Sequence, residues 1–259
     1  MANIYFAHAN GFSAKTYSYL FELLAPYKIT YIENIGHGEY EINYNWAALT
    51  NELIADIESK HQTAVVGIGH SLGAIITLFA ALKRPDLFSQ IIVLDPPLLR
   101  PNVRFGIYML GLLGLTDRYF VPAKKAKRRR QNFETRIEAY DYFKGKSLFL
   151  PFDERCLQDY VDFGLKKSED NENLTLTFLA EKEYQVFCTT PYRFPKGDLK
   201  IPATLVYSPK KEVLQPKDVA FLSKKWKWQK IISFDGVHLF PMQKPQETAN
   251  LIKKIISKK

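Results

Sequence analysis

The stretch Gly69-His70-Ser71-Leu72-Gly73 constrains the fold of this chain more than any other. An apolar, β-branched run (residues 64–68) precedes it, and an apolar segment of helical length (residues 74–82) follows and is ended by Pro85. This order of strand, tight turn and helix predicts that Ser71 projects from the end of a buried strand. The flanking glycines leave room for the helix to approach the strand, and the N-terminus of the helix favours negative charge beside the serine.

The length of 259 residues, 46% of them apolar, suits one large α/β domain with room for an inserted segment. The best candidate for a membrane span, residues 105–115, is only 11 residues long and contains three glycines. It is too short to cross a bilayer and predicts a buried helix or a lid helix instead.

The compartment can be predicted from the N-terminus and the cysteines. The first residues show neither a basic region nor a small-residue cleavage site, which argues against secretion. Cys156 and Cys188 do not have metal-ligand spacing, and a disulfide between them is possible on count alone. We expect two reduced thiols in a cytoplasmic protein, with no metal and no organic cofactor.

The net charge of +9 favours anionic substrates or surfaces. Part of the excess lies in the basic run Lys124–Arg130. Such runs usually form solvated helix faces, and no nucleic-acid motif or stacking pattern of aromatic residues accompanies this one. We expect no nucleic-acid partner, and peripheral contact of the basic run with an anionic membrane is an alternative.

Continuous apolar strands alternate with helical patterns over most of the chain. This alternation predicts an α/β fold with a mostly parallel, about six-stranded sheet covered by helices on both faces. The expected strands are residues 3–7, 28–32, 64–68, 90–95, 203–207 and 230–234. The aromatic-rich interval 98–199 interrupts the pattern and predicts a mainly helical cap inserted into a core formed by residues 1–97 and 200–259.

A serine hydroxyl becomes a useful nucleophile only when a base takes its proton and a third group orients that base. His238 lies in the loop after the last predicted strand, at the edge of the sheet where Ser71 is expected. The other four histidines have alternative explanations, such as a helix end or a glycine-containing loop. We therefore expect His238 to be the general base.

The orienting acid is less well specified by the sequence. Glu212 is the only acid in the loop after strand 203–207, and it is the favoured candidate. Asp95, after the preceding strand of the sheet, is the alternative, and a missing or unusual acid is a third option. Asp235 is too close in sequence to His238 to orient the same imidazole easily.

Acyl chemistry at a serine also needs N–H donors for the oxyanion. The backbone N–H of Leu72, directly after the serine, is one natural donor. The second should come from the loop after the first strand, residues 8–12, through the N–H of Asn10 or of Phe12.

These features together resemble the α/β-hydrolase fold superfamily over nearly the full chain. Residues 8–11 resemble its H-G-x-G oxyanion loop with alanine in place of the first glycine, and residues 34–38 resemble its G-H-G loop. Residues 237–241 resemble the loop of the catalytic histidine, with valine in place of the usual glycine. Glu212 falls where the family commonly has aspartate, and the family's two leading antiparallel strands have no counterpart here.

The resemblance implies a serine hydrolase of carboxylesterase type that cleaves esters or thioesters through an acyl-enzyme, with the cap lining the acyl or alcohol pocket. The aromatic residues of the cap suggest a small substrate with an apolar moiety. Two alternatives are an enzyme of the same fold that cleaves C–C, lactone or amide bonds, and a ligand-binding protein without turnover. The sequence does not indicate an oligomeric state.

Overall fold

The structure is a computed structural model that describes residues 2–169 and 172–257. Its centre is a six-stranded sheet in the order β2-β1-β3-β4-β8-β9, and every neighbouring pair of strands is parallel. The strands are β1 (Asn3–Ala7), β2 (Lys28–Tyr31), β3 (Val65–His70), β4 (Phe88–Leu94), β8 (Ala203–Tyr207) and β9 (Lys230–Ser233). The predicted parallel sheet of six strands is confirmed.

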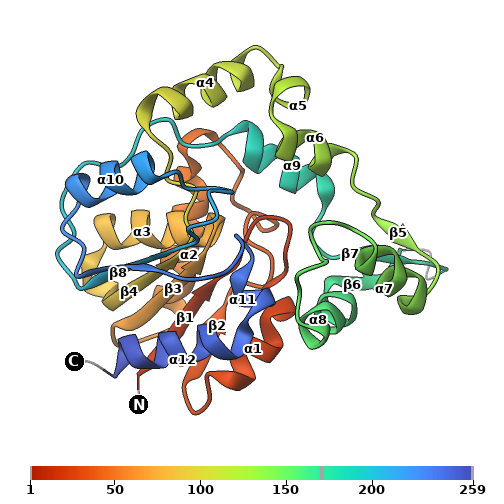
Figure 1. The fold of residues 1–259 in the computed structure, drawn as a ribbon, viewed down its shortest axis with the longest axis horizontal. Coiled ribbons are helices and arrows are strands. Elements are labelled where there is room, and N and C mark those ends of the chain that lie inside the picture. Colours follow the sequence, from red (N-terminus) through yellow and green to blue (C-terminus); the bar gives the residue numbers. More distant parts are fainter. Residues whose placement is uncertain (1, 170–171, 258–259) are drawn as a thin grey trace.

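Side chains of one strand point alternately to two separate cores, one on each face of the sheet. In β1, Ile4 and Phe6 face one core, while Tyr5 and Ala7 face the other. The first core is covered by α1 (Ser18–Leu23) and α12 (Pro245–Ile256), and the second by α2 (Ala47–Lys60), α3 (Leu72–Lys83) and α10 (Pro216–Lys225) (Figure 1). Four short helices complete the core: η1 (Ala14–Tyr17), η2 (Tyr44–Trp46), η3 (Pro85–Leu87) and α11 (Phe240–Gln243).

The cap segment, which we define as residues 98–199, lies between β4 and β8 in the chain and is mainly helical. Its helices are α4 (Pro101–Leu112), α5 (Thr116–Tyr119), α6 (Val121–Lys127), α7 (Arg136–Lys144), α8 (Glu154–Gly164) and α9 (Ala180–Cys188). It also contains a small antiparallel sheet, which the sequence pattern did not predict. Its strands are β5 (Asn132–Phe133), β6 (Leu165–Lys167) and β7 (Leu174–Leu176).

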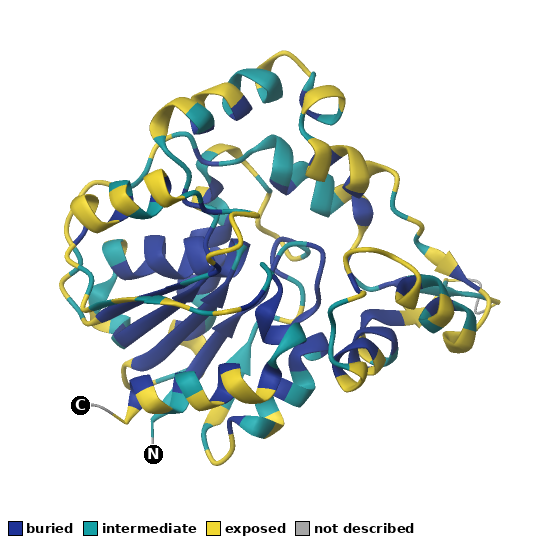
Figure 2. Cartoon of the chain, in the orientation of Figure 1, coloured by how far each residue is buried: buried dark blue, intermediate teal, exposed yellow. Residues whose placement is uncertain are grey.

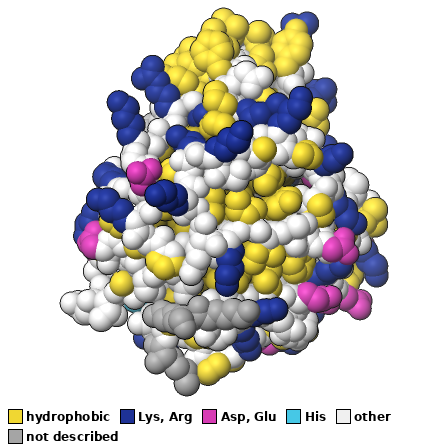
Figure 3. All heavy atoms as spheres, turned by 60° about the vertical axis from the view of Figure 1, so that its left-hand side comes forward, with side chains coloured by type: hydrophobic (Ala, Val, Ile, Leu, Met, Phe, Trp, Pro, Cys, Tyr) yellow, Lys and Arg dark blue, Asp and Glu magenta, His cyan; other side chains and the backbone are white. Residues whose placement is uncertain are grey.

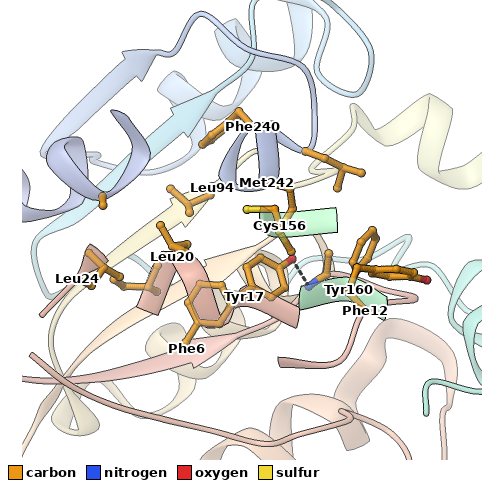
Figure 4. Close-up of a cluster of buried hydrophobic side chains, with 14 of the residues drawn as sticks. Phe6, Phe12, Tyr17, Leu20, Leu24, Leu94, Cys156, Tyr160, Phe240 and Met242 are labelled. Carbon is orange, nitrogen blue, oxygen red and sulfur yellow. Dashed lines mark hydrogen bonds between the residues drawn. The ribbon is translucent and has the colours of Figure 1, made fainter. Parts of the chain in front are cut away.

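The two halves of the cap segment are buried to different degrees (Figure 2). Helix α8 extends the first core, with Cys156 and Tyr160 packed near Phe12 and Tyr17 (Figure 4). Helix α4 instead has only two buried residues, Arg104 and Ile107. Of the two alternatives for this apolar stretch, the buried helix is therefore wrong, and the lid helix stays a prediction.

Two further features concern the environment of the chain. Within residues 2–169 and 172–257, no helix combines the length and the hydropathy that crossing a bilayer requires. Cys156 and Cys188 are both free cysteines, the first buried and the second partly buried.

Candidate active site

Ser71 lies at the tight turn between β3 and α3, as predicted. Its backbone has φ 54° and ψ −114°, a conformation that L-residues rarely adopt and that costs roughly 1–3 kcal/mol. A Cβ atom at Gly73 would lie 2.0 Å from the carbonyl oxygen of Ala7, and one at Gly69 would lie 2.3 Å from the carbonyl oxygen of Gly73. Only glycine fits at these two positions, so the turn presents Ser71 at the carboxyl edge of the sheet, at the N-terminus of α3.

Ser71, His238 and Asp95 form a continuous chain of hydrogen bonds. The Nε2 atom of His238 lies 3.0 Å from Ser71 Oγ, and its Nδ1 atom lies 2.6 Å from Asp95 Oδ2. Because a carboxylate can only accept, Nδ1 carries the proton and Nε2 is left to accept the serine hydroxyl proton. The side chain of His238 is 23% exposed, whereas Asp95 is fully buried. The second carboxylate oxygen of Asp95 accepts the backbone N–H of Ser208 at 3.0 Å.

The structure thus corrects the prediction that Glu212 orients the histidine ring. The Glu212 carboxylate accepts the backbone N–H of His238 at 2.5 Å and makes no contact with the imidazole nitrogens. Glu212 is exposed in the middle of the loop between β8 and α10, while Asp95 directly follows a central strand next to β8. The alternative acid, Asp95, is the one beside the imidazole.

The two candidate donors from the oxyanion loop differ in their availability. The backbone N–H of Phe12 donates to the carbonyl oxygen of Ala9 at 3.3 Å, so the prediction that it is a free donor is wrong. The N–H groups of Leu72 and Asn10 have no hydrogen-bond partner within the described residues. Of the three predicted donors, these two therefore keep an N–H group that no other described residue occupies.

A buried network that sequence reasoning missed connects the oxyanion loop to the loop of His238. The Nε2–H of His70 donates to the carbonyl oxygen of His238 at 3.0 Å. A carbonyl accepts only, so the other nitrogen of the neutral ring, Nδ1, must accept the Tyr17 hydroxyl proton, at 2.7 Å. The hydroxyl oxygen of Tyr17 in turn accepts the N–H of Ala9 at 3.2 Å, drawn as a dashed line in Figure 4.

The environment of His70 keeps its ring neutral. Burial and the neighbouring His238 lower the pKa of His70 to about 3. With its N–H bound to Glu212 and its C=O bound to His70, the backbone of His238 is held on both sides. Nothing local in the sequence indicates this network, because Tyr17 and His70 are 53 positions apart.

His8, at the start of the oxyanion loop, is also buried and neutral. Its Nε2 accepts the backbone N–H of Ile35 at 2.9 Å, and its Nδ1–H donates to the carbonyl oxygen of Ala9 at 2.9 Å. Burial lowers the pKa of His8 to about 4. His8 thus joins the loop after β1 to the loop after β2.

The cap segment contacts the oxyanion loop through a pair of partly buried charges. Arg129, from the basic run, forms an ion pair with Glu183 of α9 and donates to the carbonyl oxygen of Gly11 at 3.1 Å. The side-chain amide of Asn10 donates to the backbone oxygen of Glu183 at 3.1 Å. The cap therefore braces the loop that carries one candidate oxyanion donor. Within the described parts of the chain, no group of three or more His, Cys, Asp or Glu side chains is arranged to hold a metal ion.

Comparison with known proteins agrees with this geometry. The family model described as the alpha/beta hydrolase family matches residues 4–251. The chain belongs to the alpha/beta hydrolase family.

Curated relatives match shorter stretches. Ethanol acetyltransferase 1 of Hanseniaspora uvarum is 34% identical over 71 residues, 27% of this chain and 21% of the relative. A probable esterase of Oryza sativa subsp. japonica is 28% identical over 100 residues, 36% of this chain and 37% of the relative. The chain thus spans well under half the length of each of these two proteins.

Solved structures match along nearly the whole chain. E-2-(acetamidomethylene)succinate hydrolase has a TM-score of 0.76 at 16% identity, covering 98% of this chain and 91% of its own. The thioesterase domain from the curacin biosynthetic pathway has a TM-score of 0.70 at 15% identity, with the same coverage of 98% and 91%. At such identities the likeness is one of fold.

Proposed function

We propose that this chain is a serine hydrolase that cleaves carboxylic esters or thioesters through an acyl-enzyme. The observation that carries the proposal is the hydrogen-bond chain from Ser71 through His238 to buried Asp95, next to the N–H of Leu72, which has no partner among the described residues. In this assignment Ser71 is the nucleophile, His238 the general base and Asp95 the orienting acid. Glu212 has a different task, which is to hold the backbone of His238.

The geometry supports the following steps. Ser71 Oγ attacks the substrate carbonyl carbon while its proton moves to His238 Nε2, and Asp95 stabilises the imidazolium through Nδ1–H. The oxyanion is held by the N–H groups of Leu72 and Asn10, aided by the N-terminus of α3. The C–O or C–S bond then breaks and the leaving group takes the proton from His238. Water, activated by the same histidine, releases the acid and restores Ser71.

The substrate class follows from chemistry and from similarity. A probable esterase and a thioesterase domain are among the similar proteins, which supports acyl transfer from oxygen or sulfur to serine. The aromatic cap segment, proposed to span residues 98–199 between two core segments, supports a small substrate with an apolar moiety. The unpaired cysteines fit the cytoplasmic location that we propose.

The test is intact-mass analysis after exposure to a fluorophosphonate, which labels activated serines. We expect one adduct on the wild type, none on Ser71→Ala, and much slower labelling of His238→Ala. Hydrolysis of p-nitrophenyl butyrate and of the matching S-thioester then compares the two leaving groups by kcat/KM. A folded wild-type protein that forms no adduct and hydrolyses neither compound would favour the alternative of a ligand-binding protein.

A further inference from the structure

The outer end of the cap segment exposes an unusual group of large apolar side chains. We call α4–α6 and their connections, residues 101–128, the cap tip. Five large apolar residues of the cap tip are more than half exposed: Phe105, Leu112, Leu113, Tyr119 and Val121. In Figure 3 hydrophobic side chains gather at the upper end of the molecule, where Figure 1 places α4 and α5, and Lys and Arg side chains lie around and below them.

The charge of the protein is concentrated in the same place. Residues 100–130 contain nine Lys and Arg and one acidic residue, a net charge of +8, against +9 for the whole chain. The single acid, Asp117, is paired with Lys127. Arg100, Arg129 and Arg130 have acidic partners elsewhere.

Four exposed cations remain without an acidic partner among the described residues: Arg118, Lys124, Lys125 and Arg128. They come from α5 and α6 and the turn after α6, which also carry two of the exposed apolar residues. The cap tip therefore combines an apolar surface with an unneutralised positive field.

We propose that the cap tip docks on an anionic lipid surface. The apolar side chains would enter the boundary between headgroups and acyl chains, and the four cations would lie at the level of the anionic headgroups. The strength of binding should increase with the apolar area that is buried and with the attraction of the cations to anionic lipid. The proposal is independent of the proposed hydrolase activity, because it uses no residue of the Ser71 site.

Charge argues against a second copy of this chain as the occupant. A two-fold contact between cap tips would place one surface of six Lys and Arg and one Asp, a net charge of +5, against another and leave both sets of cations without partners. An acidic protein would satisfy the cations, but the exposed apolar residues are spread over three helices and do not lie along a single helix face. A lipid surface satisfies both features without requiring a shaped partner.

The chain provides matched controls for both parts of the surface. Ile137, Leu148 and Leu150 are equally exposed apolar residues at the other end of the cap segment, outside the cap tip. Lys28, Lys200, Lys227 and Lys254 are exposed cations with no acidic partner among the described residues, and the first three lie at or just before the starts of β2, β8 and β9. That edge of the sheet is opposite the carboxyl edge and the cap.

The experiment is co-sedimentation of the full chain with vesicles of phosphatidylcholine alone or mixed with phosphatidylserine. Four variants accompany the wild type. Two variants change the cap tip: one replaces Arg118, Lys124, Lys125 and Arg128 by Gln, and the other replaces Phe105 and Leu113 by Ser. The two control variants replace Lys28, Lys200, Lys227 and Lys254 by Gln, or Leu148 and Leu150 by Ser. Thermal unfolding of each variant checks that these surface changes leave the fold intact.

We expect the wild type to bind the anionic vesicles and to bind phosphatidylcholine at least tenfold more weakly. Each cation removed from the cap tip should weaken binding about fivefold, whereas the four control lysines should change it little. The apolar variant of the cap tip should also bind at least tenfold more weakly, and the Leu148 and Leu150 variant should bind as the wild type does.

Three outcomes would overturn the proposal. The first is a wild type that does not sediment with anionic vesicles. The second is equal weakening by the cap-tip and control lysine variants, because binding would then follow the total charge. The third is binding to soluble polyglutamate, lost in the cap-tip charge variant, without binding to vesicles, which would assign the surface to an acidic protein.

Discussion

The carboxyl edge of the central sheet and the cap tip show two opposite ways of placing polar and apolar groups. At the sheet edge, Asp95, His70 and Tyr17 are buried, and each has partners within the chain. At the cap tip, large apolar side chains face solvent and four cations have no acidic partner among the described residues. The side chains of the first region thus find their partners within the chain, whereas we propose that those of the second find theirs on a lipid surface.

The two regions differ in how much of their proposed function can be explained from contacts within the chain. The hydrogen bonds around His238 define the tautomer of its ring, and the proposed mechanism takes the attacking atom from this internal geometry. The exposed cap tip defines only the kind of surface that would cover it. Changes at the sheet edge should therefore affect turnover and stability, and changes at the cap tip should affect association.

Ser71→Ala should distinguish the sheet edge from the cap tip most clearly, by changing kcat and leaving vesicle binding unchanged. Removal of the nucleophile should lower kcat for p-nitrophenyl butyrate by about a million-fold, because no other group can form the acyl-enzyme. Binding to anionic vesicles should stay unchanged. The complementary variant, Phe105→Ser with Leu113→Ser, should keep its kcat on this soluble ester. Ester hydrolysis that survives Ser71→Ala would refute the assignment of the nucleophile.

Two glycine-to-alanine changes, one in each region, should have opposite effects on the free energy of unfolding. Gly73→Ala should cost about 3 kcal/mol of unfolding free energy or more, because the new Cβ would collide with the backbone of β1. Gly106→Ala in α4 should instead add roughly 0.5–1 kcal/mol, since a Cβ there has no atom within 4 Å and alanine favours the helix. Denaturant titration of both variants is the measurement. Similar effects at the two sites would contradict the close packing described for the turn.

The buried histidines predict how stability depends on pH. Burial lowers the pKa of His8 to about 4 and of His70 to about 3, so the unfolded chain binds their protons first as pH falls below 6.5. Their contribution is fully present above pH 6.5, and each should lose about 1.4 kcal/mol per pH unit below it, down to its folded pKa. Denaturant titrations at pH 7, 6 and 5 measure this slope.

Substitution isolates the contribution of one histidine to that slope. His70→Gln can keep one donor and one acceptor, and should reduce the slope by about 1.4 kcal/mol per pH unit. His61→Gln, at the end of α2 near the surface, should change the slope much less. An unchanged slope in His70→Gln would show that the ring is not held neutral.

Tyr17→Phe should affect turnover much less than Ser71→Ala does. The change leaves the N–H of Ala9 and the Nδ1 atom of His70 without their shared partner, at about 1–3 kcal/mol of stability. Because the same network holds the backbone of His238, kcat should fall about tenfold while KM changes little. Tyr19→Phe is the matched control, since its hydroxyl has no hydrogen bond within the described residues. A Tyr17→Phe enzyme that is destabilised but has normal kcat would restrict the network to a structural role.

The parts of this molecule that could be predicted from sequence are those with a local signal. The apolar strands, the glycines around Ser71 and the position of His238 after the last strand all belong to such patterns. The choice between Glu212 and Asp95 could not be predicted, because both follow neighbouring strands and only the loop conformation decides which carboxylate meets the imidazole. The same applies to Phe12, whose N–H is taken by a turn of its own loop.

Other features of the structure correspond to no recognisable pattern in the sequence. The strands of the small sheet in the cap segment are two or three residues long, too short for an alternation of apolar and polar residues to show. The contact of Tyr17 with His70 joins residues 53 positions apart. The exposure of α4 depends on packing partners, because an apolar helix has the same sequence pattern whether a neighbour covers it or not.

In the proposed mechanism Asp95, and not Glu212, orients the imidazole that activates Ser71. The most direct test compares kcat of Asp95→Asn and Glu212→Gln at neutral pH, with thermal unfolding as the check on folding. Asp95→Asn should lower kcat about ten-thousandfold, because the amide has a single acceptor oxygen for the N–H groups of Ser208 and His238, and an NH2 group facing Nδ1 would favour the wrong imidazole tautomer. Glu212→Gln should lower kcat by about tenfold at most, since the amide oxygen still accepts the N–H of His238. A larger loss of kcat in Glu212→Gln than in Asp95→Asn would contradict the assignment of Asp95 as the orienting acid.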